Sequence, residues 1–222
     1  MLGASLPCRG VCFAPFPLCD ASRHDPRIRP RPALSVAVMS TPASVPTPQV
    51  HGFASLGADE FKALFRGHPG GVAVITADPG DGPVALTATS VASVSAEPPL
   101  LIFSVSQLSS AASALVRADT VVVHLLDSAD LPLARLGATS GVDRFADTDR
   151  WSRLVTGEPV YSDVRAWVRC AVIERMDAGG STVIAAHALQ SQVSRDAAAG
   201  ALVYHDRSWH RLGDASRIEQ PA

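Results

Sequence analysis

The chain has 222 residues, of which 47% are hydrophobic, 18% charged and 5% aromatic, so we expect a soluble protein with one well-buried core. Its 19 basic and 21 acidic residues give a formal net charge of -2, which leaves no basic excess to neutralise the phosphates of a nucleic acid. No stretch approaches the roughly 20 consecutive apolar residues that a transmembrane helix needs, which argues against a membrane protein.

The first 50 residues differ in composition from the rest. They hold nine of the 17 prolines and five arginines against two acidic residues, so the remaining residues carry a net charge of -5. Because they show neither helical nor strand periodicity, they cannot bury enough surface to offset their ordering entropy. We expect 1–50 to be a disordered leader or a misassigned start, with Met39 as the true one. The prolines argue against a secretory signal and against the amphipathic helix of a transit peptide.

Cysteine usage favours a reducing compartment. Cys8, Cys12 and Cys19 lie in the leader without a histidine pair at zinc spacing, and Cys170 is alone in the rest of the sequence. We therefore expect a cytoplasmic protein without a disulfide framework or a metal site. Cys170 is expected to be a small buried residue.

Short strands with a few helices are predicted from about residue 51 onward. Apolar residues at helical spacing and acidic or hydroxyl residues in the first turn predict three helices, over 57–66, 109–116 and 127–136, the last two with a serine and an aspartate cap. Runs of β-branched and apolar residues, separated by turns rich in Gly and Pro, predict strands. The predicted strands cover 71–76, 84–95, 100–105, 120–126, 166–175, 182–193 and 201–209.

This order of elements predicts the fold class. Strands dominate, and no alternation of strand, helix and strand runs the length of the chain. A mainly β fold, a closed antiparallel barrel with added helices, is therefore favoured over a doubly wound sheet.

A dense set of hydroxyl side chains accompanies the strands over 84–95 and 100–105. Alternate positions along a strand share one face, so these hydroxyls could donate hydrogen bonds to an anionic or polar ligand, helped by the backbone N–H groups of the helix near 109. Serine and threonine also bond their own backbone, and the residues alone leave both interpretations open. No nucleophile elbow, Walker loop or dinucleotide fingerprint is present.

Short motifs follow one another in a characteristic order. They are Phe65-Arg66, Gly71-Val72, Val74-Ile75-Thr76, Thr87-Ala88-Thr89-Ser90, Ser93-Val94-Ser95, Pro98-Pro99-Leu100, Ser109, Asp143-Arg144-Phe145, Cys170 and Leu202-Val203-Tyr204-His205-Asp206. Over about residues 56–213 this series resembles the flavin reductase domain family, the short-chain reductase component of two-component flavin monooxygenases. The resemblance implies an FMN-binding split barrel, a Greek-key fold that usually forms a homodimer, and so places this domain over 51–222.

The resemblance also implies a function. NADH or NADPH would reduce FMN or FAD, and the reduced flavin would diffuse to a partner oxygenase. Hydride passes directly between the two nucleotides, so no catalytic acid or base is expected from the protein, whose task is to orient the rings.

The resemblance assigns binding positions. The flavin would contact one strand, the loop after it and the end of the next strand, and the nicotinamide would lie near a later strand. The flavin positions are Pro83, Val84, Ala85, Leu86, Thr87, Thr89, Ser90, Ser104, Val105, Ser106, Ser109 and Ser110, with Arg135 as a cation, and the nicotinamide positions are Val203, Tyr204, His205 and Asp206. Separately, Arg144 is expected either to reach a phosphate or to form an ion pair with Asp143 or Asp147.

The sequence departs from the family pattern at four places. Gly179-Gly180-Ser181 stands where the family commonly has Gly-Asp-His, Ala85 replaces a Gly, His124 replaces an Asn and Leu136 replaces a Phe. Two alternatives follow: a non-catalytic flavin carrier of the same fold, or an oxidoreductase that retains its flavin and reduces an organic substrate. We expect His124 to be a core or interface residue.

Overall fold

The structure is a computed structural model that describes residues 49–50, 52–194 and 199–219. All described residues belong to one compact unit of the chain, Thr47–Ala222. The leader predicted over 1–50, including Met39, lies outside the described residues except for its last two positions.

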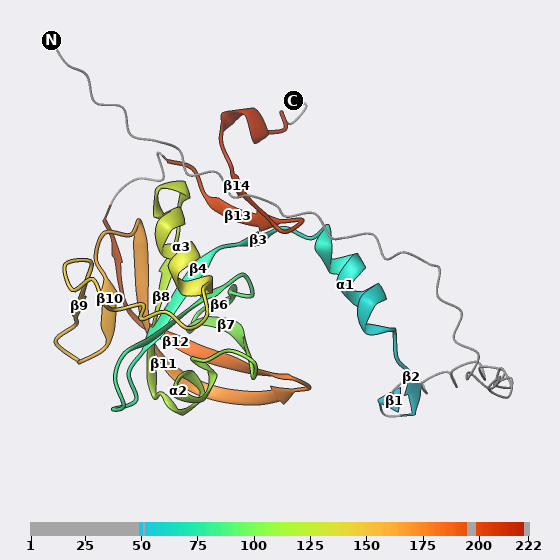
Figure 1. The fold of residues 1–222 in the computed structure, drawn as a ribbon, viewed down its shortest axis with the longest axis horizontal. Helices are drawn as coiled ribbons and strands as arrows, with labels where there is room; N and C mark the ends of the chain where they lie inside the picture. Colours follow the sequence, from blue (N-terminus) through green and yellow to red (C-terminus); the bar gives the residue numbers. More distant parts are fainter. Residues whose placement is uncertain (1–48, 51, 195–198, 220–222) are drawn as a thin grey trace, which may run out of the picture. The chain divides into compact units, whose positions relative to one another are not determined.

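The centre of the described part is one antiparallel sheet of seven strands in the order β5-β4-β8-β11-β12-β7-β6 (Figure 1). Its edges are β5 and β6. The strands are β4 (Ala73–Ala77), β5 (Val84–Ala88), β6 (Ala92–Ala96), β7 (Pro99–Ser106), β8 (Thr120–Leu125), β11 (Ala166–Ala178) and β12 (Ser181–Val193). The mainly β fold predicted from the sequence is confirmed.

Smaller elements surround this sheet. Two sheets have two strands each: β1 (Gln49–Val50) pairs with β2 (Phe53–Ala54), and β9 (Trp151–Arg153) pairs with β10 (Pro159–Tyr161). A third sheet has three strands in the order β14-β13-β3, formed by β3 (Gly70–Gly71), β13 (Leu202–His205) and β14 (Ser208–Arg211). The helices are α1 (Ala58–Arg66), α2 (Ala112–Arg117), α3 (Leu131–Ala138) and the short 3-10 helices η1 (Ser128–Asp130) and η2 (Asp214–Ser216).

The two faces of the sheet enter two separate cores. Along β4, Ile75 packs into the first core with Phe103, and its neighbour Val74 packs into the second. Helix α2 contributes Leu115 to the first core, and α3 contributes Leu133 to the second. Because successive side chains of a strand point to opposite faces, covering both faces buries every residue of β4.

Helix α3 packs closely on β5. A Cβ added at Gly137 would lie 2.4 Å from Oγ1 of Thr87, so only glycine permits this approach. The segment before α3 begins with Asp127, whose side chain and that of Asp130 form a capping box around η1. The predicted helix over 127–136 is thus confirmed as η1 followed by α3.

Three predictions of element boundaries were wrong. Helix α2 begins with Ala111 as its N-cap and has no side-chain cap, because the Ser109 hydroxyl instead accepts a hydrogen bond from the Ala111 N–H in the turn before the helix. The strand predicted over 84–95 is two strands, β5 and β6, that pair with different neighbours. The strand predicted over 201–209 is the hairpin of β13 and β14.

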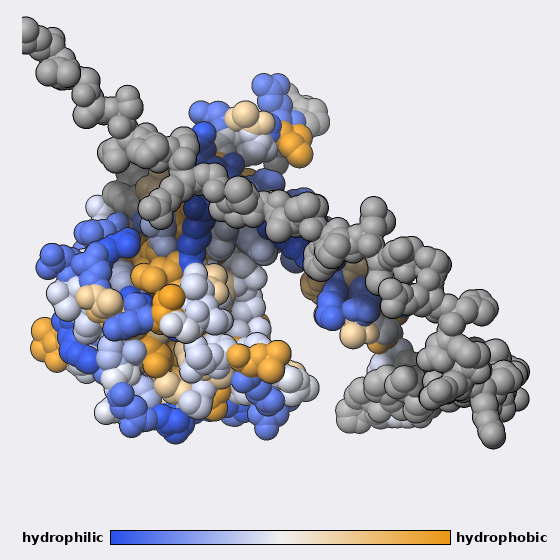
Figure 2. Space-filling model, in the orientation of Figure 1, coloured by the Kyte–Doolittle hydropathy of each residue, from blue (hydrophilic) through white to orange (hydrophobic). Residues whose placement is uncertain are grey.

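The exposed hydrophobic residues are distributed in two different ways. On the face shown in Figure 2, hydrophobic residues lie in small separate patches among hydrophilic ones. Helix α1 is different: none of its residues is buried, and Phe61, Leu64 and Phe65 are 52%, 68% and 53% exposed. Among the described residues, no helix has the length and apolar character needed to cross a membrane.

Candidate functional site

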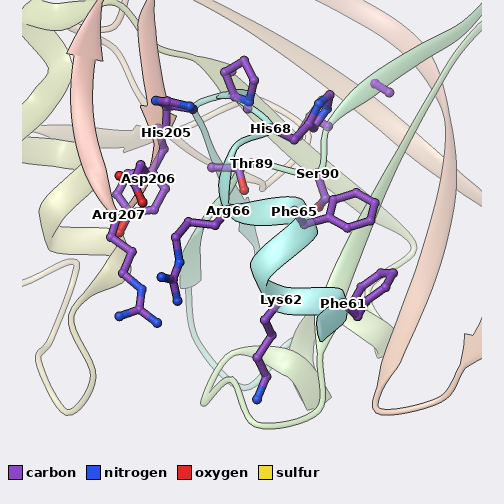
Figure 3. A pocket seen from close by; sticks show the side chains of 16 residues that line it. Phe61, Lys62, Phe65, Arg66, His68, Thr89, Ser90, His205, Asp206 and Arg207 are labelled. Atoms are coloured by element: carbon purple, nitrogen blue, oxygen red, sulfur yellow. The ribbon is translucent and has the colours of Figure 1, made fainter. Parts of the chain in front are cut away.

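A cavity of about 760 Å³ brings together two groups of the predicted binding residues; we call it the α1 cavity (Figure 3). Thr89 and Ser90, predicted to contact the flavin, line it beside Tyr204, His205 and Asp206, predicted to lie near the nicotinamide. Its remaining lining residues are Phe61, Lys62, Phe65, Arg66, His68, Pro69, Gly70, Gly71, Val91, Ala92 and Arg207.

Backbone geometry fixes the walls of the α1 cavity. A Cβ at Gly70 would lie 2.8 Å from the Cβ of Thr89, so the loop after β5 can approach β3 only because residue 70 is glycine. Gly70 in turn pairs with Tyr204 of β13. The hairpin turn after β13 is tied to α1, because the Asp206 N–H donates a hydrogen bond to the Arg66 carbonyl oxygen at 3.2 Å.

The α1 cavity combines aromatic and cationic side chains. The Phe61 and Phe65 ring centroids are 4.6 Å apart, and the Phe65 ring meets the His68 ring edge-on at 6.1 Å. Lys62 and Arg66 lie on the same helix as the two phenylalanines. Exposed aromatic faces beside cations suit a ligand that has planar rings and a negative charge.

Several predicted flavin-binding hydroxyls bond the backbone of the protein itself. The Ser90 hydroxyl accepts a hydrogen bond from the Ser104 N–H at 3.0 Å and lies 3.2 Å from the Ser104 carbonyl oxygen, linking the loop after β5 to β7. The Thr87 hydroxyl donates to the Ala134 carbonyl oxygen of α3 at 2.7 Å. These bonds show the backbone-satisfying role that the sequence left open, and they hold the edge strand β5 in place.

The hydroxyls after β7 are also engaged locally. Ser106 accepts a hydrogen bond from the Leu108 N–H and Ser109 accepts one from the Ala111 N–H, both at 3.3 Å. In both cases the serine is the acceptor, so its hydroxyl hydrogen is still able to donate. Ser110 is exposed at the start of the turn that leads into α2.

A second, smaller cavity of about 110 Å³, which we call the β5 cavity, lies at the beginning of β5. It collects the predicted positions Pro83, Val84, Ala85 and Ser110, together with Ala111, Val142, Asp143, Arg144 and Phe145. The predicted flavin positions at the beginning of β5 and the predicted position Ser110, which follows β7, therefore lie together in the β5 cavity.

Arg144 is the cation of the β5 cavity. Its Nη2 donates to the Thr139 carbonyl oxygen at 2.7 Å, and its Nε is buried without a hydrogen-bond partner in the described part of the chain. Asp143 instead accepts from the Phe145 N–H, and Asp147 from the Asp149 N–H. The expected ion pair of Arg144 with either aspartate is not formed among the described residues.

The other predicted positions lie apart from these two cavities. Arg135 is exposed on α3, and Val203 lines a different cavity beside β3. Leu86 and Val105 are buried in the first core, so only their backbone atoms could face a ligand. Ser104, Ser106 and Ser109 line neither the α1 cavity nor the β5 cavity.

Two buried titratable groups lie in the cores. His124 is fully buried, as expected for a core residue: burial lowers its pKa to about 4, opposed by a 2.9 Å hydrogen bond between Nδ1 and the Val74 carbonyl oxygen. Its Nε2 accepts from the Tyr161 N–H at 3.0 Å, so the ring is neutral with the proton on Nδ1. Cys170 is buried as predicted, and burial raises the pKa of its thiol to about 12.

Sequence reasoning missed the α1 side of the larger cavity. Phe61 with Phe65, and Lys62 with Arg66, each repeat at a spacing of four residues, which places each pair on one side of the helix. That spacing was the available signal, but it equally describes an ordinary amphipathic surface helix. Arg207 was missed because a left-handed backbone in the residue after Asp206 could not be foreseen.

The sequence and the fold are similar to known proteins. The family model described as "Flavin reductase like domain" matches residues 65–213. The NADH:FMN oxidoreductase of Rhodococcus erythropolis is 36% identical over 185 residues, which cover 82% of this chain and 95% of that protein. The family match over residues 65–213 therefore includes the seven-stranded sheet and nearly all residues that line the two cavities.

Two solved structures share the fold. A flavin reductase domain protein from Arthrobacter sp. FB24 has a TM-score of 0.67 at 30% identity, over 73% of this chain and 98% of that one. BorF, the flavin reductase component of a bacterial two-component tryptophan halogenase, has a TM-score of 0.63 at 28% identity, over 71% of this chain and 99% of that one.

Proposed function

This chain belongs to the flavin reductase like domain family, and we propose that it is an NADH-dependent flavin reductase that supplies reduced flavin to a partner monooxygenase. The split-barrel fold implied by the sequence motifs is confirmed by the similarity to solved flavin reductases. One observation in particular carries the functional proposal: the α1 cavity joins the loop assigned to the flavin with the segment assigned to the nicotinamide.

The reaction requires no chemical group of the protein to take part in hydride transfer. The nicotinamide and the flavin supply the hydride chemistry themselves, so the protein has to bring the two rings into contact and exclude other geometries. The α1 cavity offers the aromatic faces of Phe61 and Phe65 for this, and the Ser90 bridge to β7 fixes the adjoining loop. The family's usual Asp-His is replaced by Gly180 and Ser181, which lie at the tip of the β11–β12 hairpin.

We assign NADH and FMN as the preferred pair. A relative whose match covers 82% of this chain is named an NADH:FMN oxidoreductase, which supports this choice over NADPH and FAD. The flavin phosphate is assigned to the β5 cavity, where Ser110 and Arg144 lie together, and not to Arg135 on the exposed side of α3. An arginine beside a hydroxyl donor suits a phosphate group.

A cytoplasmic homodimer completes the proposal. The side chain of Leu64 on α1 is exposed in the single chain and does not line the α1 cavity, and burying it against a second copy would remove apolar area from water. Cytoplasm is supported by Cys170, a free thiol in the described part of the chain, which needs no oxidising compartment.

The proposed activity is tested by adding flavin to the purified full chain with NADH and following absorbance at the nicotinamide band. We expect a colourless protein that oxidises NADH only when FMN is supplied. A yellow protein that oxidises neither NADH nor NADPH would instead identify a flavin carrier. A yellow protein that requires an organic acceptor would identify an oxidoreductase that retains its flavin.

A further inference from the structure

The α1 cavity carries three cations that the predicted binding positions do not include. Lys62 and Arg66 extend from α1, one turn apart, and Arg207 extends from the turn between β13 and β14. Among the lining residues of this cavity, Asp206 is the one acidic residue. The cavity is therefore positively charged on balance, although the residues after 50 carry a net negative charge.

Two of these cations are available to a ligand. The Lys62 Nζ lies 3.2 Å from a carboxylate oxygen of Asp59, whereas within the described residues no carboxylate pairs with Arg66 or Arg207. Figure 3 shows the side chains of Arg66 and Arg207 pointing to the same side of the cavity. Two unpaired guanidinium groups on one cavity favour an anion between them, and their planar forks match phosphate oxygens.

The backbone holds both arginines in place. Asp206 and Arg207 have φ values of 45° and 61°, a left-handed conformation that is uncommon for residues other than glycine. The hydrogen bond from the Asp206 N–H to the Arg66 carbonyl oxygen connects this turn to the end of α1. These two residues form the two-residue loop of the β13–β14 hairpin, which favours positive φ at both positions, and the conformation sets the direction in which Arg207 leaves the hairpin.

We propose that Arg66 and Arg207 bind a phosphate group of the pyridine nucleotide, and this rests on the proposed function. Arg207 directly follows the segment assigned to the nicotinamide, while the cation assigned to the flavin phosphate, Arg144, lies in the separate β5 cavity. Each nucleotide is then anchored by its own arginine site, and the rings meet between Thr89 and Tyr204. Both the pyrophosphate and the 2′-phosphate of NADPH have the required chemistry.

The test uses ADP-ribose, which contains the pyrophosphate and no nicotinamide, so that binding is measured without turnover. We expect the full-length R66Q/R207Q variant to bind ADP-ribose roughly tenfold more weakly than the wild type by calorimetry. Arg-to-Lys replacements at both positions should recover part of this loss. The control is Arg217→Gln, which removes an exposed arginine outside the cavity and should bind as the wild type does.

The outcomes separate the possible sources of the phosphate. An equal loss for ADP-ribose and 2′-phospho-ADP-ribose supports a pyrophosphate site, and a loss confined to the latter supports a 2′-phosphate site. Unchanged binding of both ADP-ribose and 2′-phospho-ADP-ribose in R66Q/R207Q, no binding of either compound by the wild type, or weaker FMN binding with both compounds bound as by the wild type would overturn the inference. A wild type that binds ADP-ribose but never oxidises NADH would instead refute only the proposed function.

Discussion

The most deeply buried histidine shows how one residue can replace another in this fold. The family resemblance implies an asparagine at position 124; the histidine there satisfies two backbone groups, the Val74 carbonyl through Nδ1 and the Tyr161 N–H through Nε2. It thereby joins β4 and β10 across the second core. An asparagine has a donor and an acceptor too, but a shorter reach.

The buried state of His124 predicts a pH dependence of stability. Its pKa falls from 6.5 to about 4 on folding, so the unfolded chain binds the proton more tightly. The stability that depends on the neutral ring is complete above pH 6.5 and is lost as the pH falls toward 4, by about 3 kcal/mol. Urea unfolding at intervals between pH 7 and 4 measures this loss.

Replacing His124 measures how much of the pH dependence of the unfolding free energy comes from its imidazole ring. The His124→Asn variant should unfold more easily at pH 7 and show a flatter change in unfolding free energy between pH 6.5 and 4. His68→Asn, which alters an exposed histidine, is the control and should keep the slope of the wild type. Parallel slopes in all three proteins would show that His124 is not the group responsible.

Arg144 and Arg135 are the two alternative cations for binding the flavin phosphate, and replacing each in turn distinguishes them. We expect Arg144→Gln to raise the dissociation constant of FMN roughly tenfold, because a charge-assisted hydrogen bond is lost, and to leave riboflavin binding unchanged. Riboflavin lacks the phosphate, so it also reports any general damage to the cavity. If Arg135→Gln weakens FMN binding more than Arg144→Gln does, then the position implied by the family resemblance holds the phosphate. Fluorescence quenching of each flavin gives both constants.

The sequence predicted only part of the candidate site. The segments holding Thr89 and Tyr204 were identified, and the structure brings them into one cavity. The α1 and Arg207 contributions were not, because the four-residue spacing on α1 equally describes an ordinary surface helix and a cation in a turn is usually just solvated. Arg135 was assigned from the family resemblance, but which side of α3 faces β5 is decided by the packing of Gly137 on Thr87.

At the level of elements, the strands that carry β-branched runs were predicted well and the short ones were not. The apolar runs that form β4, β7 and β8 are buried on at least one face, and this burial is the reason that the sequence shows them clearly. Strands β9 and β10 have three residues each and form only because they pair with one another. Strand β11 continues beyond its predicted end because its outer half pairs with β12, an interaction invisible in local sequence.

The contact between α3 and β5 gives a prediction for two glycines. Gly137→Ala should lower the free energy of unfolding by about 2 kcal/mol, because its Cβ would lie 2.4 Å from Thr87 Oγ1 and 3.1 Å from the Thr87 nitrogen. This clash outweighs the roughly 1 kcal/mol by which alanine is favoured over glycine in a helix. Gly180→Ala is the control, since a Cβ there meets no atom within 4 Å. Equal unfolding midpoints for the two variants would contradict this packing.

For the whole molecule, the exposed side of α1 raises the question of what covers it. A helix stabilised by burial normally hides its apolar residues, yet among the described residues none of those in α1 is buried. Phe61 and Phe65 line the α1 cavity and Leu64 does not, and burying a large apolar side chain such as that of Leu64 contributes roughly 1.5 to 3 kcal/mol to an association. A second copy of the chain is the partner that every preparation contains.

We therefore predict that the protein is a homodimer in which α1 is part of the interface. Leu64→Glu should shift the mass measured by light scattering from two chains toward one, because the introduced carboxylate would have to be buried without a partner. Leu64 does not line the α1 cavity, so the cavity itself keeps all its residues. Val155→Glu makes the same change at a fully exposed position after β9 and should leave the dimer intact. A dimeric Leu64→Glu variant would place the interface elsewhere, and a monomeric wild type would refute the homodimer.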